Sequence, residues 1–201
     1  MRDFRWLDVA LLGSFVWITL IPFVLLALAI PYIVLRTRDS HEHPDPQLGL
    51  KAALHYFLSA SILLFLTGLT VISVDLLTRE AGAGGRGDDN EAIRTGVALA
   101  CSGAAFAFLH FLLLTGTDDR RNPIARRTFT GWRFAIHGVV VVSCVTTCLV
   151  LVIQKDFKWQ TLKGFLAILL VWFPSWIVHL GLLWVRATGY RPERLHVGDE
   201  D

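Results

Sequence analysis

The sequence predicts an all-α polytopic integral membrane protein, a bundle of five transmembrane helices. Of its 201 residues, 54% are hydrophobic and only 18% are charged, whereas a soluble domain usually carries about 25% charged residues. The uncharged residues are also gathered into five long runs with charged loops between them. We therefore treat residues 1–201 as a single transmembrane domain.

Each of the five runs is long enough to cross a bilayer. They cover residues 9–35, 52–74, 95–117, 134–154 and 164–185, and a helix needs roughly 20 apolar residues to cross the hydrocarbon core. Lipid cannot hydrogen-bond exposed backbone groups, so each run is expected to be helical. The first run is much longer than the apolar region of a secretory signal, about 7–15 residues, and is therefore interpreted as a membrane anchor.

Charged residues mark the borders of the other four runs. The bordering pairs are Lys51 and Asp75, Arg94 and Asp118, Arg133 and Lys155, and Lys163 and Arg186. Five crossings put the two termini on opposite sides of the membrane. Of the 19 Lys and Arg residues, 11 lie on the side of loops 36–51 and 118–133 and the C-terminal tail, and 8 lie on the other side. The positive-inside rule then predicts an outside N-terminus and a cytoplasmic C-terminus.

Composition also narrows the functional classes. The formal net charge of +2 and the dispersed basic residues argue against nucleic acid as a partner. The three cysteines lie inside apolar runs and form no disulfide framework. No phosphate-binding loop, nucleophile elbow, zinc-protease or dinucleotide fingerprint occurs, which argues against an enzyme with a soluble substrate. The expected surroundings are the lipid bilayer and either other membrane subunits or further copies of the chain.

Four of the seven histidines lie inside the last four runs, one in each: His55, His110, His137 and His179. Each is four to eight residues from a charged border on the predicted cytoplasmic side, which places all four roughly 6–12 Å below one surface at 1.5 Å per residue. Ionisable groups within spans are costly and usually face the bundle interior. We therefore expect the four imidazoles to converge in one layer.

Helical periodicity supports an inward direction for these histidines. Small residues in run 95–117 recur at the 4-3-4 spacing of Gly96, Ala100, Gly103 and Ala107, which predicts a close helix–helix seam. Polar and aromatic side chains share the faces of the other histidines and are candidate pocket walls: Ser59, Cys144, Trp172 and Trp176. Pro174 is expected to kink the last helix.

Several imidazoles in one layer point to a cofactor. Neutral imidazole is the commonest metal ligand and an axial haem ligand, so the predicted cofactor is haem b or a transition metal such as Zn, Cu or Fe. The plan is similar to that of the membrane cytochrome b subunits that anchor oxidoreductases, a resemblance of architecture alone. Subunits of that class with two haems commonly place ligands near both faces. Four histidines near one face fit one haem, one metal or no cofactor.

Three functions remain open at this point. The first is a redox or metal-binding membrane subunit that transfers electrons within a larger complex. The second is a structural or assembly subunit whose histidines only tie helices together. The third is a proton or ion channel or transporter, which the lack of carboxylates at the membrane centre and of an inverted repeat disfavours.

Overall fold

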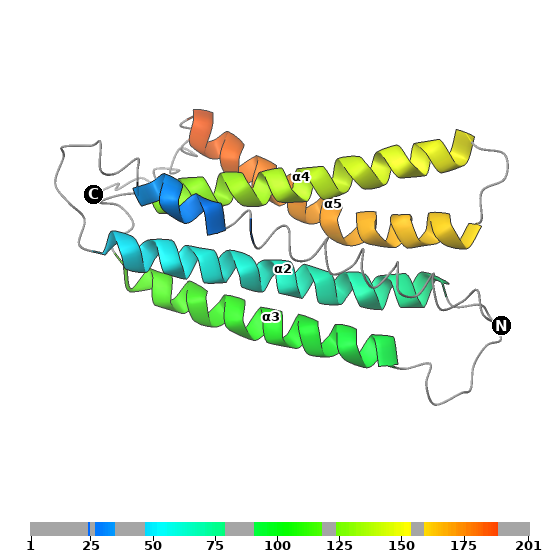
Figure 1. Ribbon diagram of the computed structural model, residues 1–201, viewed down its shortest axis with the longest axis horizontal. Helices are drawn as coiled ribbons and strands as arrows, with labels where there is room; N and C mark the ends of the chain where they lie inside the picture. Colours follow the sequence, from blue (N-terminus) through cyan, green and yellow to red (C-terminus); the bar gives the residue numbers. More distant parts are fainter. Residues whose placement is uncertain are drawn as a thin grey trace, which may run out of the picture.

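Four long helices form the body of the protein. The computed structural model describes residues 24, 27–34, 47–78, 91–117, 124–153 and 159–188, which are helical except for turn residues at 47, 116 and 117. The helices are α2 (Leu48–Thr78), α3 (Glu91–Thr115), α4 (Ile124–Ile153) and α5 (Trp159–Thr188). Figure 1 shows them side by side along the longest axis of the molecule.

The apolar character of the helices suits a lipid environment. Each of the four is long and apolar enough to cross a membrane. At most 28% of the residues in their apolar stretches are buried inside the protein, so most of the apolar surface faces outward. Large side chains such as Phe108 (64% exposed) and Val139 (67% exposed) lie on that surface. Apolar surface on this scale marks contact with lipid or with other membrane helices.

The predicted helices in runs 52–74, 95–117, 134–154 and 164–185 are confirmed, with ends that differ from the uncharged runs. The largest difference is in α4, which begins at Ile124, ten residues before the run at 134. Arg is a good helix former, so the helix continues through Arg126, Arg127 and Arg133. Of the first predicted span, residues 24 and 27–34 are described and helical; the rest of 9–35 lies outside the described residues.

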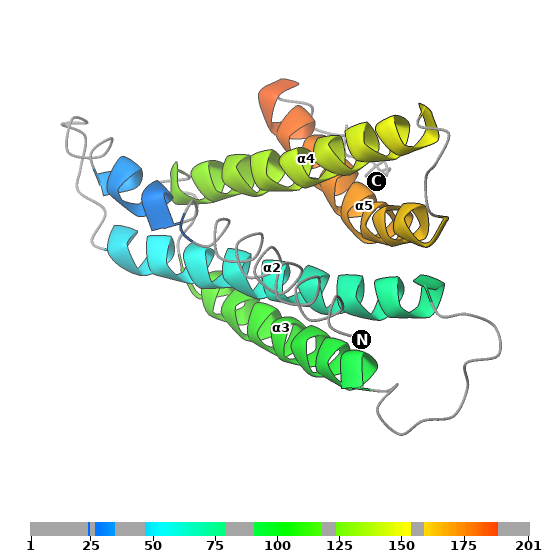
Figure 2. The ribbon, with the colours of Figure 1, turned by 45° about the vertical axis from the view of Figure 1, so that its right-hand side comes forward.

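Helix α2 is the centre of the arrangement. It contacts α3, α4 and α5, and α4 also contacts α5, whereas α3 contacts no other of these four helices than α2. In Figures 1 and 2, α2 and α3 run antiparallel as one pair and α5 crosses α4 as a second pair. Pro174 lies inside α5. The bundle therefore consists of two helix pairs joined through α2.

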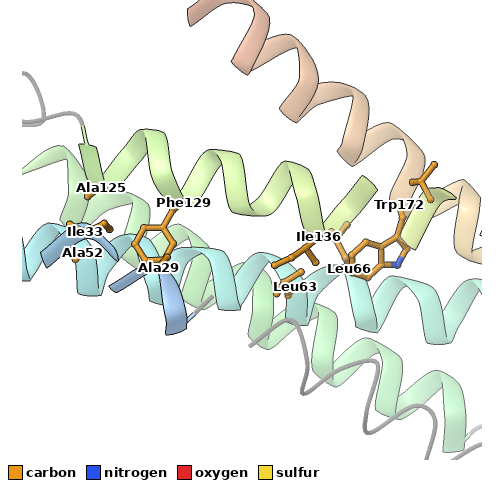
Figure 3. Close-up of a cluster of buried hydrophobic side chains, with 10 residues drawn as sticks. Ala29, Ile33, Ala52, Leu63, Leu66, Ala125, Phe129, Ile136 and Trp172 are labelled. Atoms are coloured by element: carbon orange, nitrogen blue, oxygen red, sulfur yellow. The ribbon is translucent and has the colours of Figure 1, made fainter. Parts of the chain in front are cut away.

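A continuous apolar core lies between α2 and α4. Phe129 of α4 is fully buried, together with Ala29 and Ile33 of the segment 27–34. Figure 3 shows these three side chains at one end of the cluster, and Leu63, Leu66, Ile136 and Trp172 further along. The segment 27–34 thus packs against the first turns of both long helices.

Glycines hold α2 and α3 together at backbone distance. Gly96, Ala100 and Gly103 are all buried, as the 4-3 spacing predicts. A Cβ placed on Gly103 would lie 2.7 Å from the Cα of Phe65, and one placed on Gly96 would lie 2.9 Å from the carbonyl oxygen of Gly68. Any side chain at either position would therefore force the two helices apart.

Candidate functional site

Helices α4 and α5 bring two of the four predicted site histidines into contact. His137 of α4 is fully buried, and His179 of α5 is 7% exposed. Their ring centroids are 4.7 Å apart and the ring planes are perpendicular. We call these two residues the imidazole pair. It is a direct contact between titratable side chains from two different membrane helices.

Ser175 of α5 orients both rings of the imidazole pair. Its backbone oxygen lies 2.8 Å from Nδ1 of His179, one helical turn further along. A carbonyl oxygen can only accept a hydrogen bond, so Nδ1 of His179 donates, and in the neutral ring Nε2 then carries the lone pair. The Ser175 hydroxyl oxygen lies 3.2 Å from Nδ1 of His137. One residue therefore engages the Nδ1 atoms of both imidazoles.

The remaining ring nitrogen of His137 is the distinctive atom of the site. Its Nε2 is buried and has no hydrogen-bond partner. A buried polar atom left without a partner costs about 1–3 kcal/mol, and most such atoms in proteins are satisfied. The ring is enclosed by His179 and by Trp172, whose ring meets it edge-on at 5.3 Å. The Nε2 atom of His137 is therefore a buried polar atom without a hydrogen-bond partner inside the bundle.

The two tryptophans predicted as pocket walls have different surroundings. Trp172 contacts His137, and its indole nitrogen donates a 2.9 Å hydrogen bond to Oγ1 of Thr70 in α2. Trp176 stacks on Phe134 with the ring centroids 5.8 Å apart, and its indole nitrogen lies over Gly138. That nitrogen is buried and, like Nε2 of His137, lacks a hydrogen-bond partner. Trp172 borders the imidazole pair, while Trp176 closes the α4–α5 contact beside it.

The two small wall residues lie further from the imidazole pair along the helices. Ser59 of α2 is fully buried and donates a 2.7 Å hydrogen bond to the backbone oxygen of His55. Cys144 of α4 is 6% exposed and follows His137 by seven residues, a rise of about 10 Å along the helix.

His55 lies at a different depth from the imidazole pair. It is 4% exposed and stacks on Phe129 of α4, with the ring centroids 6.2 Å apart. Phe129 precedes His137 by eight residues, which corresponds to about 12 Å along the axis of α4. His55 is therefore in the apolar core near the start of α2.

His110 lies on the outer pair of helices. It stacks on Phe57 of α2 with the ring centroids 5.4 Å apart, and its Nδ1 donates to the backbone oxygen of Phe106 at 2.6 Å. Since α3 contacts α2 alone among the four helices, His110 has no direct route to the imidazole pair. The four histidines thus form one pair and two separate aromatic contacts instead of the expected layer.

The expected layer does not form because two of the charged residues taken as helix borders, Lys51 and Arg133, are buried inside the bundle. Arg133 is only 8% exposed and lies within α4, bonded weakly to the backbone oxygen of Phe129 and to Oγ1 of Thr130. Lys51, the border of run 52–74, is fully buried. Arg133 lies four residues before His137 and therefore on the same helix face. This spacing could have predicted that Arg133 points into the bundle together with His137.

Comparison with known proteins does not identify the chain: no protein-family model, curated protein or solved structure matches it. The function must therefore be argued from the site itself. Within the described residues, no group of three or more His, Cys, Asp or Glu side chains is arranged to hold a metal ion. A metal ion at the imidazole pair would therefore need further ligands from outside the described residues.

Proposed function

We propose that this chain is the integral membrane subunit of a larger complex and that the imidazole pair holds a transition-metal cofactor, haem b or a single ion, for electron transfer. The observation that carries the proposal is the buried Nε2 of His137, which has no hydrogen-bond partner and lies beside a second imidazole. Polar groups inside membrane spans are costly and commonly mark functional sites.

The hydrogen bonds of Ser175 support the same proposal. A histidine that ligates a metal almost always donates its other ring N–H to a carbonyl, carboxylate or water. His179 does so through Nδ1 to the Ser175 backbone oxygen, and His137 has its Nδ1 on the Ser175 hydroxyl. If a metal is bound, Nε2 of each ring would be the ligand atom.

The proposal extends to the topology and partners of the chain. The helical segment 27–34 would complete a fifth crossing within 9–35, with the N-terminus outside and the C-terminus in the cytoplasm. The outward apolar surface would contact lipid and either other subunits or a second copy. The excess of basic residues on one side, 11 against 8, supports this orientation.

A structural subunit without cofactor is the second candidate, and two hydrogen bonds favour it. The bond from Ser175 to His137 joins α5 to α4, and the bond from Trp172 to Thr70 joins α5 to α2. Under this alternative the imidazole serves only as a tie between helices.

Metal analysis and absorption spectroscopy of the purified full chain test the proposal. We expect near-stoichiometric haem or transition metal, lost in both His137→Ala and His179→Ala. The control is His110→Ala, which removes an imidazole of the outer helix pair and should retain the cofactor. Absence of haem and metal from protein purified without chelators, and no uptake on reconstitution with either, would overturn the proposal in favour of the structural subunit.

A further inference from the structure

We infer that α5 is a hinged helix. Pro174 divides it into a first arm, residues 159–173, which stays with α2, and a second arm, residues 175–188, which closes on α4 and separates from it. The inference goes beyond the proposed function, because it describes a movement of the chain itself and needs no cofactor. It draws on the backbone at Pro174, on the contacts of the two arms and on the buried indole nitrogen of Trp176.

The backbone of α5 is interrupted near its middle. Pro174 lies inside the helix, and a proline has no N–H to donate to the carbonyl oxygen four residues before it, which here belongs to Leu170. Proline is a common cause of sharp bends in helices, and α5 bends near its middle in Figure 1. The two arms are therefore joined by a stretch of backbone with fewer hydrogen bonds than the rest of the helix.

The first arm is fixed to α2. Trp172 is only 7% exposed, and its indole nitrogen donates a 2.9 Å hydrogen bond to Oγ1 of Thr70. Thr70 in turn donates to the backbone oxygen of Leu66 at 2.8 Å, so both polar groups of this contact have partners. Trp172 also meets His137 of α4, but only ring against ring, because its N–H is engaged by Thr70. The hydrogen bond of the first arm thus goes to α2.

The second arm is fixed to α4 by a contact that leaves a polar atom unused. Three interactions form it: the Ser175–His137 hydrogen bond at 3.2 Å, the Trp176–Phe134 stacking and the His179–His137 ring contact. The indole nitrogen of Trp176 is buried there without a hydrogen-bond partner. An indole N–H can only donate, so a metal at the imidazoles would not satisfy it. Most buried polar atoms in proteins are satisfied, and separation of the second arm from α4 would let this N–H reach an acceptor.

Gly138 of α4 is the position against which the Trp176 indole rests. A Cβ on Gly138 would lie 3.0 Å from the indole nitrogen and 3.6 Å from Cδ1, so alanine there would press the second arm away from α4. Gly131 of the same helix has nothing within 4 Å of such a Cβ. Gly131→Ala therefore makes the same change in helix propensity without touching α5, and serves as the matched control for Gly138→Ala.

The test is double electron–electron resonance on the full chain in detergent, with the three native cysteines replaced by alanine and spin labels on pairs of introduced cysteines. Leu50→Cys with Leu182→Cys reports the distance of the second arm from α2, and Leu77→Cys with Leu166→Cys reports that of the first arm. All four side chains are exposed. We expect two distances for the first label pair, from the closed and separated arrangements, and a single distance for the second.

The variants decide whether Pro174 and the α4 contact control this movement. Pro174→Ala returns the missing N–H and joins the two arms into one continuous helix, so one of the two distances should be lost. Gly138→Ala should raise the ratio of separated to closed molecules several-fold, while Gly131→Ala should leave it at the wild-type value. A single distance between the labels at 50 and 182 that Gly138→Ala does not change would overturn the inference. Two distances that persist in Pro174→Ala, or two distances for the first arm as well, would also overturn it.

Discussion

The two helix pairs of this bundle are held together by different chemistry. Helices α2 and α3 meet at backbone distance through Gly68, Gly96 and Gly103. Helices α4 and α5 meet through imidazole and indole rings and a side-chain hydrogen bond. The α2–α3 contact also includes the stacking of His110 on Phe57, whereas the α4–α5 contact leaves two buried nitrogen atoms without hydrogen-bond partners. Close backbone packing explains most of the first contact, but it does not explain the buried polar atoms of the second.

The surroundings of the glycines differ between the two helix pairs in the same way. Cβ atoms at Gly131 of α4 and at Gly164 and Gly181 of α5 would meet nothing within 4 Å, whereas those at the three seam glycines would clash with backbone atoms of the facing helix. Among the described glycines, those whose Cβ would clash with backbone atoms of a facing helix lie along the α2–α3 seam. In α4, a Cβ on Gly138 would lie 3.0 Å from the indole nitrogen of Trp176, which is a side-chain atom.

The largest effect is expected from a substitution that forces α2 and α3 apart. Gly103→Leu places a branched side chain against the backbone of Phe65, and overpacking of this kind costs about 1–3 kcal/mol or more. We expect a clear loss of thermal stability in detergent. Gly181→Leu is the matched control, since its Cβ points into open space, and it should unfold at the wild-type temperature. Equal stability of the two variants would contradict the seam.

A smaller effect is expected at the link between the two pairs. Trp172→Phe keeps the ring against His137 but removes the indole N–H that bonds to Thr70, and Thr70→Val removes the acceptor. Hydrogen bonds between membrane helices contribute about 0.6 kcal/mol on average and about 1.7 at most. A double-mutant cycle on the free energy of unfolding should give a coupling in this range, and zero coupling would show that the bond does not stabilise the fold.

The smallest effect is expected at the imidazole pair. His137→Leu loses the hydrogen bond to Ser175 but also removes a buried nitrogen without a partner, and these two contributions to the free energy of unfolding oppose each other. We expect a net change within about 1 kcal/mol in metal-free protein. A loss above about 3 kcal/mol would mean that His137 is chiefly a structural tie between α4 and α5, and the contrast between the two helix pairs would disappear.

The sequence correctly predicted the features that depend on a single helix. Uncharged runs located four helices, because only a helix satisfies its backbone in lipid. The 4-3 spacing located the seam residues of α3, but the facing Gly68 was missed because a spacing rule on one helix says nothing about its neighbour. Scanning run 52–74 for small residues would have found it.

The grouping of the histidines could not be predicted in the same way. Depth was measured from Lys51 and Arg133, and both are buried inside the bundle. Nor does periodicity say which helices are adjacent, so the position of α3 against α2 alone was not foreseen. Ser175 lies one helical turn before His179 in the sequence, yet its contact with His137 depends on how α5 crosses α4.

The lengths of the helices set how the protein meets its membrane. Helix α2 has 31 residues and α4 and α5 have 30 each, so each is about 45 Å long at 1.5 Å per residue, against a hydrocarbon core of about 30 Å. In a bilayer, tilting would remove part of this excess and the remainder would extend into the headgroup layer. Because α4 is already helical at Arg126 and Arg127, these guanidinium groups would be held there by a helix instead of a loop. Lipid phosphates would therefore meet them at a fixed spacing, and bilayer thickness would decide how far the helix stands above the apolar layer.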